Sequence, residues 1–344
     1  MCHCPALVSI QAMVIAVIEP YKRRPRICWC LLMGILFLAA WGRSLEAAPA
    51  QTAAFPRIVT LFQGATDSAL ALGVVPVGSV VAWENPPLYP YWGDRIEALK
   101  GAPPVHWLGL ETQPNLEEIA WLQPDHIIAT SFRHTQIMGL LGDIAPVQSV
   151  ADVYDFKATL QAVARATGQQ KKAQHMLCQW DHQVADLRAQ LKRTLGDAWP
   201  PRVAVVNIRQ DHVRLYYHGF AGAILDEVGF RRPAADEGER WGIKLTSREA
   251  IPALEADVIF LFMDKQNPQV RQTYQRWREH PLWQQLTAVR RQAVWPVDRV
   301  AWSLGGGWLA AEQVMTDLYR LYGLDQPAFE ACPYAVEGSV HEAH

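Results

Sequence analysis

The chain has 344 residues, half of them hydrophobic, which is enough for two domains of ordinary size. Its 32 Lys and Arg residues nearly balance 34 Asp and Glu residues, and no basic run follows the N-terminal segment. This balance argues against nucleic acid as a partner.

The first 50 residues are typical of a targeting segment, and we assign residues 1–50 to a signal peptide and leader. Positive charges between Lys22 and Arg26 precede the apolar run Ile27–Trp41, which is short for a membrane span. Small residues at 47–50 make cleavage plausible. We therefore expect a periplasmic protein, exported with a cleaved signal peptide; a retained membrane anchor is the alternative.

Only two cysteines lie beyond this leader, Cys178 and Cys332. An oxidising compartment would allow them to form a disulfide, but two unreactive thiols fit the sequence equally well.

Strand and helix patterns alternate through residues 51–168, which we assign to an N-terminal α/β lobe. Runs of apolar and β-branched residues predict its strands, and Gly, Pro and capping residues mark its helix ends. The predicted strands are 57–62, 74–82, 107–110 and 126–130, and the predicted helices are 67–72, one that begins near Asn115, and 155–167.

One long helix is predicted within residues 169–196. Apolar residues recur at spacings of three and four from Ala173 to Leu195, and Gly196 then stops the pattern. Such a helix spans roughly 35–40 Å at 1.5 Å per residue. It is either a rigid connection between two lobes or an ordinary surface helix of one domain.

Residues 197–324 repeat the alternation and are assigned to a C-terminal α/β lobe, with 325–344 as a tail. The predicted strands are 202–208, 257–262 and 292–297, and the predicted helices are 221–228, one capped by Thr246 or Ser247, and 309–322.

An internal repeat supports two similar lobes. Residues 115–128 align without a gap on residues 247–260, which pairs Glu117 with Glu249 and Asp125 with Asp257. We therefore predict an α/β fold of two similar lobes joined by the long helix. Open α/β sheets bind ligands at the carboxyl ends of their strands, so a ligand cleft is expected between the lobes.

No strong enzyme motif is present: the sequence lacks G-x-S-x-G, H-E-x-x-H, a Walker loop and a strand-linked G-x-G-x-x-G. We predict no catalytic residue and no metal ligand. The glycine triplet 305–307 before a helix could hold an anion, or could be only a flexible turn.

Arginines and aromatic residues are the candidates for binding. Arg133 and Arg209 each follow a buried strand, where they could bind an acidic ligand or form solvated salt bridges. Aromatic residues in predicted loops could line a cleft for a large, partly apolar ligand, or could be core and lid residues. They are Trp83, Tyr91, Trp92, Phe132, Tyr216, Tyr217, Trp241 and Trp302.

Several segments resemble the periplasmic ferric-siderophore-binding proteins of ABC importers, with the ferric-citrate and ferric-hydroxamate members most similar. They are Gly109–Ile119, Leu122–His134, Pro281–Leu286 and Ala301–Glu312, and the resemblance extends over residues 57–322. It implies two α/β lobes joined by one long helix that close little on binding.

The resemblance also implies roles for individual residues. Glu117 and Glu249 fall where members contact arginines of the permease; their alternative role is to complement the helix dipole. Glu111 stands where members often carry an Arg that holds the chelate, which argues against a citrate-like ligand. The implied ligand-binding residues are Arg133, Trp241 and Trp302, and less directly Trp83, Tyr91 and Arg209.

The predicted function is capture of a ferric siderophore, of hydroxamate or citrate type, and its delivery to an inner-membrane ABC permease. No catalysis and no cofactor are expected, since the chelator already satisfies the iron, and a monomer is expected. A haem- or cobalamin-binding protein is the alternative, with His134, His218 or Tyr217 as axial ligand. An exported α/β hydrolase-type enzyme and an anchored receptor that signals are also compatible with the sequence.

Overall fold

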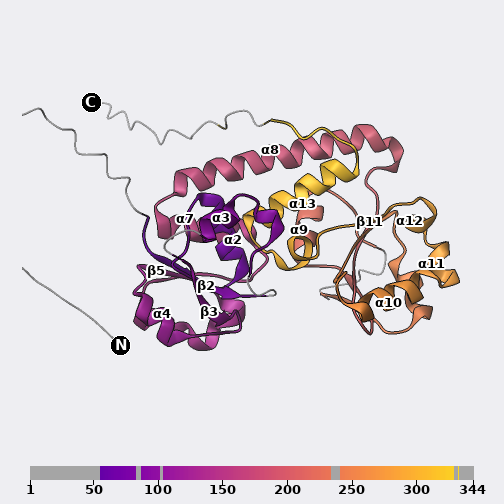
Figure 1. Cartoon of the computed structure of the whole chain (residues 1–344). Helices are drawn as coiled ribbons and strands as arrows, with labels where there is room; N and C mark the ends of the chain where they lie inside the picture. Colours follow the sequence, from indigo (N-terminus) through magenta and orange to yellow (C-terminus); the bar gives the residue numbers. More distant parts are fainter. Residues whose placement is uncertain (1–54, 83–86, 101–103, 234–240, 329–331, 333–344) are drawn as a thin grey trace, which may run out of the picture. The chain divides into compact units, whose positions relative to one another are not determined.

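The computed structural model describes residues 55–82, 87–100, 104–233, 241–328 and 332 (Figure 1). The predicted leader and most of the predicted tail lie outside these residues. Within the described ranges, no helix is both long enough and apolar enough to cross a membrane.

The N-terminal lobe is built on a six-stranded sheet with the order β4-β3-β2-β1-β5-β6. β1 pairs in parallel with β2 and β5, and β4 pairs antiparallel with β3. The strands are β1 (Ile58–Thr60), β2 (Gly78–Val81), β3 (His106–Leu110), β4 (Gln113–Pro114), β5 (His126–Thr130) and β6 (Val147–Val150). The helices are α2 (Gln63–Leu72), η1 (Pro90–Trp92), α3 (Arg95–Lys100), α4 (Leu116–Leu122), α5 (Ser131–His134), η2 (Thr135–Ile137), α6 (Met138–Ile144) and α7 (Phe156–Thr167).

The C-terminal lobe has a five-stranded sheet with the order β11-β10-β7-β8-β9. β7, β10 and β11 are parallel, whereas β8 and β9 follow β7 in antiparallel pairing. The strands are β7 (Val203–Ile208), β8 (Val213–Tyr216), β9 (Gly242–Leu245), β10 (Val258–Met263) and β11 (Val294–Pro296). The helical segments are η3 (Gly196–Ala198), α9 (Phe220–Val228), η4 (Arg248–Leu254), α10 (Pro268–Arg278), α11 (Pro281–Gln285), α12 (Thr287–Arg290), the π-helix η5 (Val300–Leu304) and α13 (Trp308–Leu321).

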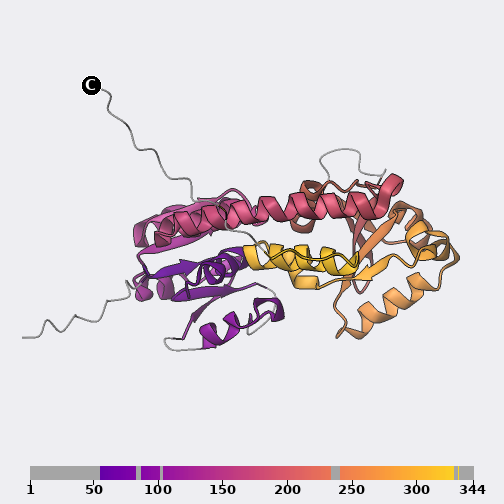
Figure 2. The ribbon, with the colours of Figure 1, turned by 90° about the horizontal axis from the view of Figure 1, so that it is seen from above.

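The long helix α8 runs from Gln170 to Leu195, as predicted, and α13 lies beside it (Figure 2). The Tyr319 hydroxyl of α13 donates to Asp186 Oδ2 of α8 at 2.8 Å. One apolar cluster continues from Ile58 in β1 to Phe260 in β10 and includes the buried faces of both helices. The prediction of two similar lobes joined by a long helix is therefore confirmed, and α13 adds a second element that packs on both.

α13 begins against α2 of the N-terminal lobe. The buried carboxylate of Asp67 accepts hydrogen bonds from the backbone N–H groups of Leu309 and Ala310, at 2.5 and 3.2 Å. Ser68 Oγ accepts from Trp308 N. The glycine triplet permits this approach, because a Cβ on Gly307 would lie 2.6 Å from Asp67. The anion at this helix N-terminus is thus a side chain of the protein itself.

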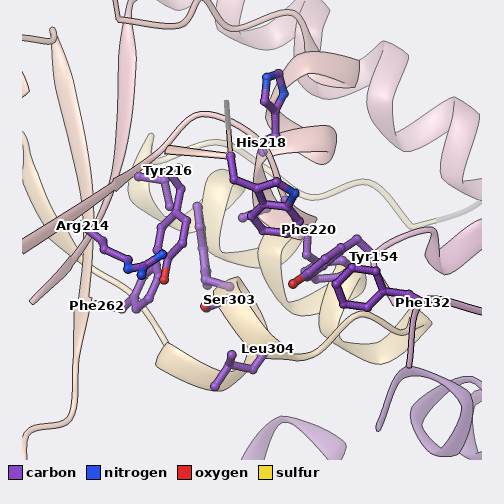
Figure 3. Close-up of a pocket in the computed structure, with 15 residues that line it drawn as sticks. Phe132, Tyr154, Arg214, Tyr216, His218, Phe220, Phe262, Ser303 and Leu304 are labelled. Atoms are coloured by element: carbon purple, nitrogen blue, oxygen red, sulfur yellow. The ribbon is translucent and has the colours of Figure 1, made fainter. Parts of the chain in front are cut away.

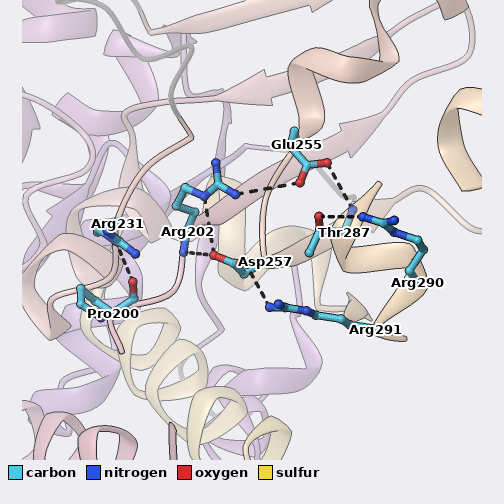
Figure 4. A network of polar contacts seen from close by, with 8 residues as sticks. All are labelled: Pro200, Arg202, Arg231, Glu255, Asp257, Thr287, Arg290 and Arg291. Atoms are coloured by element: carbon cyan, nitrogen blue, oxygen red, sulfur yellow. Dashed lines mark hydrogen bonds and ion pairs between the residues drawn. The ribbon is translucent and has the colours of Figure 1, made fainter. Parts of the chain in front are cut away.

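The sequence repeat corresponds to a repeated structural unit. Asp125 Oδ2 accepts from Arg57 N at 2.7 Å just before β1 and β5 pair, and Asp257 Oδ2 accepts from Arg202 N at 2.9 Å just before β7 and β10 pair. In the C-terminal lobe, Asp257 also forms an ion pair with Arg291, at 3.1 Å (Figure 4). Each aspartate therefore ties together the starts of two neighbouring parallel strands.

Several features of the chain differ from, or go beyond, the sequence prediction. Four aromatic residues predicted in loops lie in helical segments: Phe132 in α5, Tyr91 and Trp92 in η1, and Trp302 in η5. Tyr216 lies in strand β8, not in a loop, because the hairpin β7–β8 continues the sheet. Cys178 and Cys332, left open by the sequence, form a disulfide that joins α8 to the residues after α13.

Candidate ligand-binding site

A cavity of about 490 Å³ lies between the two lobes. Phe132 follows β5, Tyr154 follows β6 and Phe262 lies near the end of β10, so the cavity is at the carboxyl ends of parallel strands, as expected for an open α/β sheet. Arg214, Tyr216 and Phe262 lie on one side of it, with Phe132 and Tyr154 on the other (Figure 3). The predicted cleft is therefore present, and both lobes line it.

The C-terminal lobe supplies a rigid aromatic wall. Tyr216 stacks on Phe262 with ring centroids 6.0 Å apart and an interplanar angle of 13°. Trp302 also lines the cavity but is only 1% exposed, since it packs on Phe260 and donates from Nε1 to Asp317 Oδ2 at 2.8 Å. These partners hold the aromatic surfaces in place before any ligand arrives, which limits the ordering cost of binding.

Trp241 forms the exposed part of the wall. Its side chain is 45% exposed, and its ring centroid lies 4.7 Å from that of Tyr154, across the two lobes. Its carbonyl oxygen accepts from Tyr217 N at 3.2 Å. Gly219 allows this packing, because it has φ +116° and a Cβ there would lie 3.2 Å from the ring.

Arg214 is the arginine that lines this cavity, and it was not among the residues predicted from the sequence. It lies in β8 opposite Asn207, on the same face of the strand as Tyr216. Within the described parts of the chain, no acidic side chain forms an ion pair with it. The alternation Val213-Arg-Leu-Tyr216 is the signal that could have placed Arg214 and Tyr216 on one face of a strand.

Arg133 is held in an ion pair. Its Nε lies 2.5 Å from Oε1 of Glu111, and the two side chains are 20% and 8% exposed. Burial raises the pKa of Glu111, while the charge of Arg133 and the hydrogen bond from Gln63 N lower it. Arg133 is therefore neutralised locally, which the sequence could not show because Glu111 lies 22 residues away, in the turn between β3 and β4.

These two residues line a small recess of about 20 Å³ next to the main cavity. Gln63 also lines it, and Tyr154, Ser303 and Leu304 line both the recess and the cavity. Arg133 therefore lines the recess and does not line the main cavity.

The remaining candidates lie elsewhere. Tyr91 does not line the cavity: its hydroxyl accepts from Gln63 Nε2 at 2.9 Å, and its ring packs beside Tyr89 and Trp92 in the N-terminal core. Arg209 is exposed in the β7–β8 turn, beyond the cavity lining. Trp83 lies outside the described residues.

The candidate axial ligands for haem differ in availability. His134 is 1% exposed and both ring nitrogens are engaged, with Thr130 N and Glu111 O. Tyr217 is also buried, whereas His218 lines the cavity.

One group of possible metal ligands occurs in the described chain: Cys178, His182 and Cys332, with their ligand atoms within 4.8 Å. The disulfide between the two sulfurs occupies them.

Glu117 and Glu249 occupy matched positions at the starts of α4 and η4, and both are exposed. Asn115 Oδ1 accepts from Glu117 N, and Ser247 Oγ accepts from Glu249 N. The repeat therefore presents one acidic side chain from each lobe.

Residues 58–299 match the family described as periplasmic binding protein. The chain belongs to this family. Because its members are binding proteins of transporters, the prediction that the protein is not an enzyme is confirmed.

Relatives and solved structures agree with this assignment. The chain is 44% identical over 270 residues to an achromobactin-binding periplasmic protein of Dickeya dadantii, covering 78% of this chain and 87% of that protein. It is 29% identical over 273 residues to the Fe(3+) dicitrate-binding periplasmic protein FecB of Escherichia coli, covering 77% and 84%. The crystal structure of Staphylococcus aureus SirA complexed with staphyloferrin B has a TM-score of 0.71 and 36% identity, covering 80% of this chain and 96% of that one. The resemblance to siderophore-binding proteins is confirmed.

Proposed function

We propose that this protein captures an anionic, carboxylate-bearing ferric siderophore between its lobes and delivers it to an ABC permease in the inner membrane. The observation that carries the proposal is Arg214, a cation without an acidic partner among the described residues, set in the aromatic wall of a 490 Å³ cavity. Relatives named for achromobactin and for ferric dicitrate support this ligand class.

The cavity suits a chelate rather than a bare metal ion. Its volume is in the usual range for small-molecule sites, and Tyr216, Phe262 and Trp241 offer broad apolar surfaces. Iron enters as part of the ligand, with its coordination sites filled by the chelator. The protein then contributes burial of apolar surface and charge-assisted hydrogen bonds to chelate oxygens.

Charge distinguishes the two ligand types that the sequence left open. Three hydroxamates carry three negative charges and neutralise Fe³⁺, whereas citrate-type chelates keep excess negative charge. An arginine without an acidic partner among the described residues favours the second type, because the excess negative charge of such a chelate can pair with its guanidinium. Glu111 does not counter this, since its charge is paired with Arg133.

Tryptophan fluorescence titration tests the proposal. Ferric dicitrate should quench the protein saturably, and a neutral ferric trihydroxamate should bind more weakly. Arg214→Gln should weaken ferric dicitrate binding about 10- to 100-fold, the range for losing a hydrogen bond to a charged group. Arg209→Gln, an exposed arginine of the same hairpin, is the control and should change affinity less than about twofold. Unchanged affinity in Arg214→Gln would reject the proposal.

Glu117 and Glu249 are proposed to dock arginines of the permease. Their exposure and matched positions on the two lobes support this role. Replacing both with Ala should abolish ferric-chelate uptake by cells and leave the Kd of the purified protein unchanged. The control is Glu118→Ala, an exposed acid in the same first turn of α4. Weakened chelate binding in the double variant would contradict a docking role.

The proposal includes export: residues 1–50 act as a cleaved leader, and the mature protein is a periplasmic monomer. N-terminal sequencing of protein released from the periplasm tests the cleavage, and an uncleaved, membrane-bound chain would overturn it.

We further propose lobe boundaries at 51–168 and 197–324, since each range contains one of the two sheets.

A further inference from the structure

The helix α4 presents an exposed tryptophan. Among the residues that the structure describes, Trp121 is the most exposed large apolar side chain, at 72%. The other exposed tryptophan, Trp241, lines the ligand cavity, whereas Trp121 does not. Tryptophan is one of the residue types most enriched among the contacts that carry the binding energy of protein interfaces. The surface of α4 is therefore a candidate for contact with another protein.

The indole of Trp121 is oriented by a neighbour in β3. The ring of His106, the first residue of that strand, lies with its centroid 5.4 Å from that of Trp121, at an interplanar angle of 64°. α4 packs beside β3 in the N-terminal lobe (Figure 1). Because this contact restricts the rotation of the indole while most of its surface stays exposed, little conformational entropy is lost when a partner packs on it.

Glu117 lies one helical turn before Trp121. Residues four apart in a helix share one face, with their Cβ atoms about 5–6 Å apart. Glu117 is exposed, and no residue in the described ranges forms an ion pair with it. One face of α4 therefore combines an available negative charge with an exposed aromatic ring.

Arginine is the side chain that matches both features. The carboxylate of Glu117 attracts a cation, and a guanidinium can form two parallel hydrogen bonds with it. The flat face of the same guanidinium can stack on an indole, and it is less strongly hydrated than the ammonium of lysine. An arginine bound by Glu117 would thus have Trp121 within reach of its guanidinium and its aliphatic stem.

The C-terminal lobe lacks this combination. The alignment of residues 115–128 on 247–260 pairs Glu117 with Glu249, but it pairs Trp121 with Ala253. The acidic residue at the start of η4 therefore has no aromatic ring at the matched position, and the two exposed glutamates are not equivalent.

We propose that Glu117 and Trp121 bind the same arginine of the permease, with its guanidinium paired to the carboxylate and stacked on the indole. The N-terminal lobe then makes the stronger of the two docking contacts. The inference rests on the proposed function, to which it adds a further docking residue and a difference between the lobes.

Spheroplasts of the bacterium that encodes this protein, made from a strain that lacks it, allow docking to be measured. Purified mature protein is added back at increasing concentration, and the initial rate of radioactive ferric dicitrate uptake is followed. The concentration of protein that gives half the maximal rate reports docking to the permease. Calorimetric titration with ferric dicitrate reports ligand binding separately.

Trp121→Ala should raise the half-saturating concentration about 10-fold, equivalent to about 1.4 kcal/mol, and leave the Kd for ferric dicitrate unchanged. Trp121→Phe keeps a smaller ring and should raise it by about threefold or less. The control is Leu140→Ala, an exposed apolar residue of α6 in the same lobe, which should change it by less than about twofold.

A double-mutant cycle tests whether the two residues share one arginine. Combining Trp121→Ala with Glu117→Ala should raise the half-saturating concentration by less than the product of the two single effects, because each variant weakens contact with the same side chain. Combining Trp121→Ala with Glu249→Ala, on the other lobe, should give the product.

A full product in the first pair, or wild-type docking by Trp121→Ala, overturns the inference while leaving the proposed function in place. A dimer of the purified protein that Trp121→Ala abolishes in analytical ultracentrifugation would assign the ring to a second copy of the chain and also overturn it. No uptake of ferric dicitrate with the wild-type protein, together with no binding of this chelate by calorimetry, rejects the proposed function and the inference with it.

Discussion

The two lobes share one structural unit and use it differently. In each, a capped helical segment leads to an aspartate, Asp125 or Asp257, that holds the backbone of an arginine at the start of the neighbouring strand. After that, the N-terminal sheet is parallel apart from β4, whereas in the C-terminal lobe β7 continues into the antiparallel strands β8 and β9. The hairpin brings Arg214 and Tyr216 to the cavity, and Trp241 precedes β9.

The aspartates that stabilise the sheets and the residues that line the cavity therefore lie in different parts of the molecule. The repeated aspartates lie at the starts of strands and stabilise the sheets, while most of the cavity lining comes from the C-terminal lobe and only Phe132 and Tyr154 from the other. The N-terminal lobe contributes the recess of Glu111 and Arg133 instead. The two lobes therefore share a repeated unit but differ in strand order, and they contribute unequally to the cavity.

The largest expected effect concerns the contact between lobes. Asp67→Ala leaves the buried N–H groups of Leu309, Ala310 and the Trp92 ring without an acceptor. We expect a loss of about 3–5 kcal/mol of unfolding free energy, since each unsatisfied buried donor costs about 1–3 kcal/mol. Urea denaturation measures it, with Asp94→Ala, outside this contact, as the control. A loss below about 1 kcal/mol would show that α13 does not depend on Asp67.

The two copies of the repeat differ at one matched position, and exchanging the residues there tests the difference. η4 is a 3₁₀ segment and α4 an α-helix, and Pro252 stands where the repeat has Ala120. Ala120→Pro should cost about 3 kcal/mol, because proline lacks the N–H needed in an α-helix interior. Pro252→Ala should change stability by less than about 1 kcal/mol. Thermal denaturation compares the two, and similar costs would refute this explanation of the difference.

Asp67 should also give the stability of the protein a pH dependence. Burial raises the pKa of Asp67 from 3.8 to about 7, against the hydrogen bonds that favour its ionised form. Between these values the folded protein binds more protons than the unfolded chain. The contribution of Asp67 to stability is therefore complete below pH 3.8 and declines as the pH rises towards 7, by at most about 1.4 kcal/mol per pH unit.

Comparing wild type with Asp67→Asn from pH 4 to 8 isolates this contribution, because the other carboxylates are common to both proteins. The stability difference in favour of wild type should shrink with rising pH. A difference that stays constant or grows would mean that the hydrogen bonds from α13 outweigh burial and keep the pKa low.

Much of the architecture could be predicted from the sequence because it depends on local patterns. Apolar spacing predicted α8 at its observed bounds, and the repeat predicted two lobes with Glu117 and Glu249 at matched helix starts. The strand β8 was missed, since four residues of alternating polarity are a weak signal beside the long apolar runs of β7 and β10.

The site itself was decided by contacts between distant residues. Arg133 stays a predicted ligand-binding residue, and the ion pair that it forms with Glu111 of the β3–β4 turn could not be predicted from the sequence. Trp302 was predicted in a loop, but Asp317 and Phe260 hold it in the wall of the cavity. The sequence alone determined the two α/β lobes, their connecting helix and the family resemblance, because periodicity and motifs depend on residues that are close together in the chain. Only the tertiary structure decided which arginines form ion pairs and which side chains line the cavity, because charge pairing and burial depend on what the fold brings together.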